Sequence, residues 1–250
     1  MQGCQRMFRK RRSPFIAEQS SRLTEPGRIE QGEAGSGNGI SNLTDMAYRK
    51  IKGMMMNYDI VPGQRLIFVD LAKRLGVSRT PVNSALGILA AEGFLDFVPN
   101  QGYTVHEITR EEARDLYELR KILETGAIEK VIERVTPKKL ELLKKRQNLY
   151  EKAVLENISR GRFTLDQEFH AAYIQMADNS YLTDYFREIY QRIFLRHRIE
   201  GLQAGGAKEV VSEHKALFEA IRQRDVKRAR HLIEEHIEAG EKYIFSAVFD

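Results

Sequence analysis

Four side chains in the C-terminal half of the chain have the types and spacing to bind a metal ion: Asp166, His170, His214 and His236. Asp166 and His170 are four residues apart, so they project from one face of a predicted helix. All four lie on stripes that are otherwise apolar, which places them inside a helical core. The stripes also contain Phe163, Tyr173 and Ala177, then Val210, Leu217 and Ile221, then Ala229, Ile233 and Gly240.

A buried imidazole needs a polar partner, and two explanations are available. One divalent ion would satisfy all three histidines at once, because three His and one Asp form a first-row transition-metal ligand set. Alternatively, each histidine bonds independently to a carbonyl or a Tyr hydroxyl. For any single histidine the independent explanation is favoured. For the four together a metal is favoured, because scattered core histidines give no reason for an Asp one turn before His170.

Arg120 is a further candidate, since it lies between Leu116 and Leu123 on the inward stripe of its predicted helix. A guanidinium placed there must meet an anion or extend outward to solvent. It could bind the carboxylate of a small effector, or it could pair with Glu124 one turn further on. Spacing alone leaves both interpretations open.

The elements that carry these residues are predicted to be long helices. Thr109-Arg110-Glu111-Glu112 is typical of a capping box, and Thr136-Pro137 of a helix start. We expect Leu116, Leu119, Leu123 and Ala127 to form the inner face of the first helix. Six such helices with short links predict an antiparallel bundle of six, or seven, helices. Their expected ranges are 109–134, 136–157, 162–178, 181–200, 209–223 and 225–246, with a glycine-containing loop at 201–207.

A different pattern precedes the bundle, at residues 76–89. Gly76 suits a tight interhelical turn, Ser78 is expected to cap the next helix, and Pro81 falls in its first turn. Such a helix–turn–helix places its second helix in the DNA major groove. The predicted inward positions are Val82, Leu86 and Leu89, and the predicted outward ones are Arg79, Thr80, Asn83 and Ser84.

The flanking segments indicate a winged form of this motif. Helices are expected near 41–58, with Leu43, Ala47, Ile51, Met54 and Tyr58 inward, and near 67–75, with Phe68, Leu71, Ala72 and Leu75 inward. Gly93 should end the second motif helix. Apolar runs at 94–98 and 103–108 around a turn at 99–102 predict a β-hairpin. The fold class is therefore mainly α, a winged helix–turn–helix with a small β-hairpin followed by the bundle.

Composition narrows the class of protein. The chain has 250 residues, 42% of them hydrophobic, which is enough for two cores, and no run of apolar residues long enough to span a membrane. The single cysteine, Cys4, excludes an internal disulfide framework and suits a reducing cytoplasm. The net charge of +5 arises entirely before residue 111, since residues 111–250 carry 25 basic and 25 acidic side chains. This asymmetry gives mild support for DNA contact at the N-terminal end.

Three domains follow from these patterns. Residues 1–40 are expected to be a disordered tail, in which the basic run 9–12 is a solvated segment or a phosphate contact. Residues 41–108 form the predicted DNA-binding domain. Residues 109–250 form an all-helical domain for metal and effector binding and for dimerisation.

The order of elements in residues 41–108 resembles the winged helix-turn-helix of the GntR family of bacterial transcription regulators. As a block, the matching text is highly specific. It comprises Pro62-Gly63, Leu66, Leu71-Ala72, Leu75-Gly76-Val77-Ser78-Arg79-Thr80-Pro81-Val82, Ala85-Leu86, Leu89, Glu92-Gly93, Gly102 and Val105.

The helical part is similar to the ligand-binding (FCD) domain of the FadR-type branch of that family. The matches are Glu118-Leu119-Arg120, Leu123-Glu124, Asp166, Phe169-His170, Asn179, Leu182, Glu213-His214, Ala220-Ile221, Asp225, Ala229 and His236. The resemblance implies a bound zinc or nickel ion on Asp166, His170, His214 and His236. It also implies a small carboxylic acid as effector, which favours effector binding by Arg120.

The sequence departs from the family pattern on the predicted recognition helix. Asn83 stands where the family usually has Arg, Ser84 where it has an acidic residue, and Gln101 where the wing is often basic. Arg79 is then the only charged base reader on this helix. Because Asn pairs bidentately with adenine whereas Arg favours guanine, we expect a shifted recognition sequence.

Three functions are compatible with these patterns. The favoured one is a homodimeric, ligand-responsive transcription regulator, not an enzyme, that reads a pseudo-palindromic operator with Ser78, Arg79, Thr80, Asn83 and Gly102. The second is a metal-dependent hydrolase with an appended DNA-binding domain. The third is a bundle that uses a purely structural metal for dimerisation.

Overall fold

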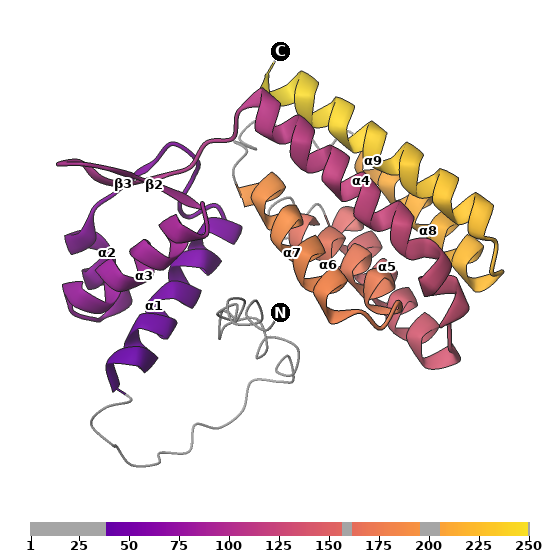
Figure 1. Cartoon of the computed structure of the whole chain (residues 1–250), viewed down its shortest axis with the longest axis horizontal. Coiled ribbons are helices and arrows are strands. Elements are labelled where there is room, and N and C mark those ends of the chain that lie inside the picture. The colour runs from indigo at the N-terminus through magenta and orange to yellow at the C-terminus, as the bar shows by residue number, and fades with distance from the viewer. Residues whose placement is uncertain (1–38, 157–161, 196–205, 250) are drawn as a thin grey trace, which may run out of the picture. The chain divides into compact units, whose positions relative to one another are not determined.

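A computed structural model describes residues 39–156, 162–195 and 206–249 (Figure 1). The predicted disordered tail and its basic run lie outside the described residues, as does most of the loop predicted at 201–207. In the described ranges no helix is both long and apolar enough to cross a membrane.

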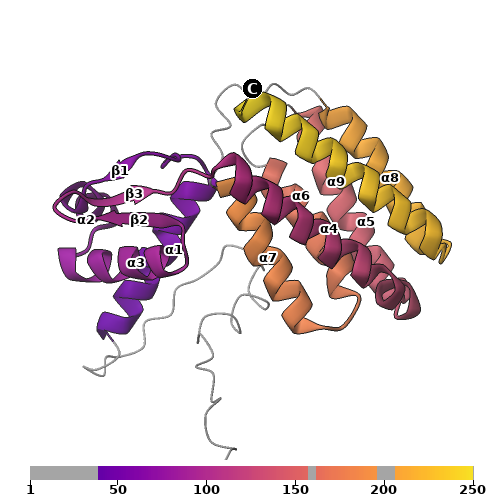
Figure 2. The ribbon, with the colours of Figure 1, turned by 45° about the horizontal axis from the view of Figure 1, so that its top comes forward.

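The N-terminal part contains three helices and a three-stranded antiparallel sheet (Figure 2). In the sheet, β3 lies between β1 and β2, and Phe97 of β2 faces Tyr103 of β3. The winged helix-turn-helix is therefore confirmed. The sequence patterns missed only β1, because two residues are too few to show an alternating pattern. The elements are α1 (Gly39–Met56), β1 (Arg65–Leu66), α2 (Phe68–Leu75), α3 (Arg79–Ala91), β2 (Leu95–Val98) and β3 (Gly102–Val105).

The turn before α3 is built as expected, except at its cap. Gly76 ends α2 in the left-handed region, with φ 70°, and Pro81 is buried in the first turn of α3. Ser78 occupies the N-cap position with extended backbone, but its hydroxyl makes no capping hydrogen bond. The predicted capping role of Ser78 is therefore wrong. The side chain is exposed and free to face a partner outside the motif.

The buried face of α1 differs slightly from the predicted one. Ala47, Ile51 and Tyr58 are buried as expected, together with Met55 in place of Met54, which is only partly buried. Leu43 is 41% exposed, so its predicted inward position is wrong. The first turn of α1 extends beyond α3, the helix against which α1 packs (Figure 1).

The C-terminal part is an antiparallel bundle whose six described helices match the six expected. Helix α4 packs against α6, α7 and α9, while α5 packs against α6 and α8. The threonine at residue 109 forms the predicted capping box with Glu112, and Thr136 caps α5 through the backbone N–H of Lys139. The helices are α4 (Arg110–Glu133), α5 (Pro137–Leu155), α6 (Arg162–Gln175), α7 (Ser180–Leu195), α8 (Ala207–Arg222) and α9 (Val226–Val248).

The inward face of α4 is more polar than the leucine pattern predicts. Leu119 is 41% exposed, so its predicted place on the inner face is wrong, and Leu116 and Leu123 are only partly buried. The buried positions near the centre of the helix are instead Tyr117, Arg120, Glu124, Ala127 and Ile128. The buried stripe therefore includes two charged side chains, Arg120 and Glu124, which are paired with each other.

The two caps give a direct test of the local structure. Thr109→Ala should lower the free energy of unfolding by about 1 kcal/mol, because the backbone N–H of Glu112 loses the hydroxyl that accepts its hydrogen bond. Ser78→Ala should change the free energy of unfolding by only a few tenths of a kcal/mol, since no capping bond is lost. Denaturant unfolding monitored by circular dichroism measures both. Equal losses for the two variants would contradict this description of the caps.

Candidate metal centre and its cavity

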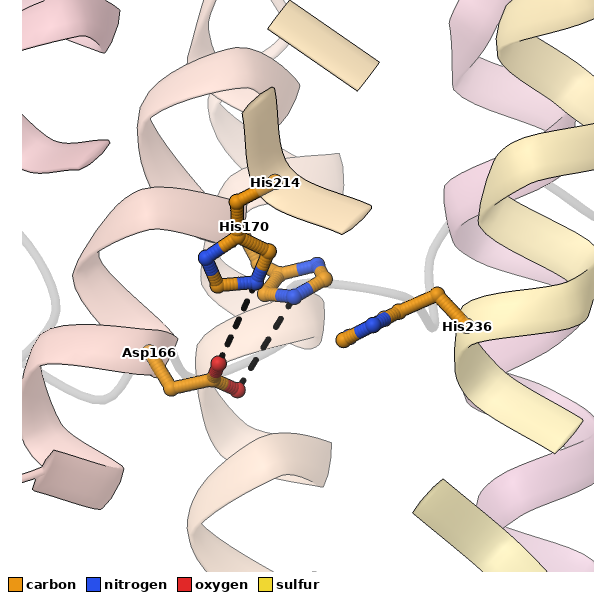
Figure 3. Close-up of side chains that lie close together, drawn as sticks. All are labelled: Asp166, His170, His214 and His236. Atoms are coloured by element: carbon orange, nitrogen blue, oxygen red, sulfur yellow. Dashed lines mark ion pairs between the residues drawn. The ribbon is translucent and has the colours of Figure 1, made fainter. Parts of the chain in front are cut away.

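The four predicted ligands come together inside the bundle (Figure 3). Asp166 and His170 come from α6, His214 from α8 and His236 from α9. One potential ligand atom of each lies within 4.8 Å of those of the other three. His170 is fully buried, His214 is 1% exposed, and Asp166 and His236 are each 8% exposed. The cluster could hold a metal ion.

The carboxylate of Asp166 lies between two of the imidazoles. Its Oδ1 is 3.3 Å from His214 Nε2, and its Oδ2 is 3.8 Å from His170 Nε2. The contact with His214 lacks hydrogen-bond geometry, so neither ring nitrogen of His214 has a hydrogen-bond partner among the described residues. Burying an imidazole without a hydrogen-bond partner costs free energy unless another group binds the ring nitrogens.

The other two imidazoles are oriented by carboxylates outside the cluster. His170 Nδ1 lies 2.6 Å from Glu124 Oε2, and His236 Nδ1 lies 2.6 Å from Glu213 Oε2. If each Nδ1–H donates to its carboxylate, each Nε2 presents a lone pair, and that of His170 lies 3.4 Å from Arg120 Nη2. Carboxylate–histidine pairs of this kind fix the tautomer of histidines that bind metals.

These two glutamates are functional candidates that the sequence patterns did not identify in this role. Glu124 was considered only as a partner for Arg120, and Glu213 only as a neighbour of His214. His170 and His236 therefore bond to carboxylates instead of the carbonyls or Tyr hydroxyls expected for independent core histidines. The sequence did contain one sign of this role for Glu124, since this residue lies on the inward stripe of its helix.

Burial and neighbouring charge set the protonation states in the cluster. Burial alone would raise the pKa of Asp166, but His214, His170 and His236 hold it well below its ordinary value. Burial lowers the pKa of His214 to about 4, against the opposing effect of Asp166. At neutral pH the cluster thus offers a carboxylate and a neutral imidazole, the forms that bind metal ions.

Arg120 forms the ion pair that was one of its two predicted roles. Its Nε donates to Glu124 Oε1 at 2.6 Å, and its guanidinium lies 5.0 Å from the centre of the Tyr190 ring. Glu124 also accepts from Tyr173, and Tyr190 donates to Asp166. Arg120 nevertheless lines a cavity. The ion pair with Glu124 is therefore formed, and an effector-binding role stays a prediction.

The cavity has a volume of about 180 Å³ and lies beside the cluster. Asp166 and His236 line it, together with Arg120 and Glu213, whereas His170 and His214 do not. An ion held by the cluster would therefore have one side toward the cavity. A small molecule in the cavity could reach that side.

The predicted DNA-reading residues lie at one end of the helix-turn-helix. Arg79, Thr80 and Asn83 are exposed on the first turns of α3, and Ser78 is exposed just before it. Gly102 begins β3 with φ +87°, and a Cβ there would lie 3.4 Å from the Phe68 ring. This is the arrangement expected of base-reading side chains, and their contacts with DNA stay a prediction.

Comparison with known families agrees with this architecture. The model of the bacterial regulatory proteins of the gntR family matches residues 43–105. The FCD domain model matches residues 115–239, which is 125 of the 250 residues. The chain therefore belongs to the GntR family of bacterial regulatory proteins and carries an FCD domain. It is a DNA-binding transcription regulator with an effector-binding domain.

Similar proteins have names that agree with this class. The chain is 37% identical to the Nta operon transcriptional regulator of Aminobacter aminovorans over 141 residues, which cover 56% of this chain and 66% of that one. It is 28% identical over 200 residues to the HTH-type transcriptional regulator McbR of Escherichia coli, covering 78% and 89%. The solved structure of E. coli McbR/YncC has the same fold, with a TM-score of 0.73 at 23% identity, covering 82% and 97%.

The buried pair on α4 gives a stability prediction. Glu124→Ala should lower the free energy of unfolding by about 3–5 kcal/mol, because it leaves Arg120 buried without its anion. The exposed pair Lys130–Glu133 on the same helix is the matched control, and Glu133→Ala should have no measurable effect. Denaturant unfolding of both variants without added metal measures the difference. A change in Glu124→Ala as small as that in the control would contradict the assignment.

Proposed function

We propose that this regulator senses a small carboxylic acid at a divalent transition-metal ion, zinc or nickel, held by Asp166, His170, His214 and His236. His214 carries the metal part of the proposal. Its buried ring has no hydrogen-bond partner among the described residues, and it faces three other potential ligands within 4.8 Å. A metal ion supplies the missing partner, and the carboxylates on His170 and His236 orient those rings toward it.

The cavity supports the sensing part of the proposal. It meets the cluster at Asp166 and His236, and Arg120 contributes a guanidinium to its wall. An acid in this cavity would place its carboxylate between the metal and Arg120. The guanidinium would form a charge-assisted hydrogen bond with it. Effector binding would then change DNA affinity through a coupling free energy of ~1–3 kcal/mol.

We also propose that the protein acts as a homodimer in the cytoplasm on a pseudo-palindromic operator. Exposed apolar side chains lie on two helices that pack against each other, α4 and α7. They are Leu119 and Ile122 on α4, and Tyr181 and Tyr185 on α7. A self-complementary contact through this surface would bring two winged helix-turn-helix domains together, one for each half-site of the operator.

Metal binding can be tested one residue at a time. The wild-type chain should bind one zinc ion, and His214→Ala should weaken binding at least a hundredfold, because a ligand is lost. Glu213→Gln should weaken it about 10–100-fold, since His236 loses its orienting carboxylate. His231→Ala is the matched control, because this histidine is exposed on α9 outside the cluster.

Competition titration with a zinc chelator measures these affinities. Unchanged affinity in His214→Ala would contradict the metal site. If zinc raises thermal stability but no carboxylic acid changes DNA binding, the metal is purely structural.

Substitution of the predicted base-contact residues tests the proposed DNA reading. Arg79→Ala should reduce affinity for the operator to that for unrelated DNA, because the charged base reader of α3 is lost. Arg222→Ala, an exposed arginine on α8, should leave affinity unchanged. Operators obtained by selection of bound oligonucleotides, followed by gel-shift titration, provide the measurement. Selection should also return half-sites with adenine opposite Asn83, and recovery of the usual family half-site would contradict that expectation.

A further inference from the structure

The wall of the cavity is rich in aromatic side chains. Two of them, Phe163 and Phe194, lie with ring centres 5.0 Å apart and ring planes at 36°. The cavity volume of about 180 Å³ leaves room for a small molecule. The ligand body that fits such a wall is apolar and flat. The aromatic lining residues are Tyr117, Tyr150, Phe163, Phe194 and Tyr243.

Two tyrosine hydroxyls in this wall lack partners. Tyr117 is 1% exposed and Tyr150 is 4% exposed, and both line the cavity. No hydrogen bond from either hydroxyl is found within the described ranges, and neither hydroxyl oxygen is among the fully buried unpartnered atoms there, so both reach the open space of the cavity. The two buried tyrosines next to the cluster behave differently, since Tyr173 donates to Glu124 and Tyr190 to Asp166. Because these two phenol groups open onto the cavity and are not bonded to the described protein, they are available to a ligand there.

Tyr150 lies close to the cluster, and Tyr117 lies on the same helix face as Arg120. The Tyr150 ring centre is 4.9 Å from that of His214. Tyr117 is three residues before Arg120, so the two share one face of α4. A carboxylate beside Asp166 and His236 would thus have two phenol donors and a guanidinium around it.

We propose that the effector is an aromatic carboxylic acid, with Tyr117 and Tyr150 donating hydrogen bonds to its carboxylate and the aromatic wall holding its ring. This inference rests on the proposed function, since it names the class of acid sensed at the same site. Tyr117 and Tyr150 are then specificity-determining residues.

A substitution at Gly240 can reduce the size of the cavity without altering the two tyrosines. It lines the cavity from α9, and a Cβ at this position would meet no atom of a neighbouring element within 4 Å. A larger side chain there would occupy space now available to a ligand. Because glycine is a poor residue in a helix interior, the substitution should not destabilise α9.

The first experiment is calorimetric titration of the zinc-loaded full-length protein with three probes: benzoate, cyclohexanecarboxylate and acetate. Benzoate should bind at least about tenfold more tightly than either of the others, because only its ring is flat and aromatic. Tyr117→Phe and Tyr150→Phe should each weaken benzoate binding about tenfold or more, since hydrogen bonds to charged groups are lost. Zinc content should be unchanged in both variants, because neither phenol belongs to the cluster.

The second experiment compares two glycine substitutions. Gly240→Val should abolish benzoate binding and leave zinc binding intact. Gly53→Val on α1 is the matched control, because it is also a helical glycine with open space around its Cβ position, outside the bundle. It should leave benzoate affinity unchanged.

The outcomes separate this inference from the proposed function. Equal affinity for benzoate and cyclohexanecarboxylate, tighter binding of acetate, or unaltered benzoate affinity in both Tyr→Phe variants would overturn the inference while zinc and acid sensing remain. Failure of every acid to bind zinc-loaded protein would overturn the inference and the sensing role together. Failure to bind zinc would overturn the proposed metal site itself.

Discussion

The structure of the bundle depends on how buried ionisable groups are compensated at its centre. Arg120, Glu124, Asp166 and three histidines are withdrawn from water there, and each must meet an opposite charge or a hydrogen-bond partner. The Glu124 carboxylate is hydrogen-bonded to Arg120, His170 and Tyr173 at once. His214 alone among the ring groups of the cluster lacks a hydrogen-bond partner in the described part of the chain. This imbalance is what a divalent cation would correct.

The same compensation links the cluster to the cavity. Arg120 is fixed by Glu124 and stacks over Tyr190, which itself donates to Asp166. A ligand that reaches Arg120 therefore acts on a group connected to α4, α6 and α7. Packed and charge-paired helices respond to such a change by shifting between discrete arrangements. The bundle thus has the connections needed to convert occupancy of a cavity into movement of helices.

Much of this site could be predicted from the sequence because helical periodicity places residues on faces. The spacing of Asp166 and His170, and the apolar neighbours of His214 and His236, were enough to predict that the four lie inside. Periodicity could not predict the pairing of Glu124 with His170 or of Glu213 with His236, because it gives no rotation of one helix against another. The same limit explains Leu119, which a leucine stripe placed inward although Tyr117, Arg120 and Glu124 take the buried positions. The predicted capping role of Ser78 was wrong for another reason, because rotation of the side chain decides whether a capping bond forms.

The metal ion that we propose at Asp166, His170, His214 and His236 can be detected directly. X-ray absorption spectroscopy of the zinc-loaded protein tests this proposal most directly, because it reports the atoms bound to the ion and their distances. We expect imidazole nitrogens at about 2.0–2.1 Å from the zinc ion and a carboxylate oxygen at about 2.0–2.2 Å. In His214→Ala one imidazole contribution should disappear. A spectrum without histidine scattering, or one that is identical in His214→Ala, would contradict the account.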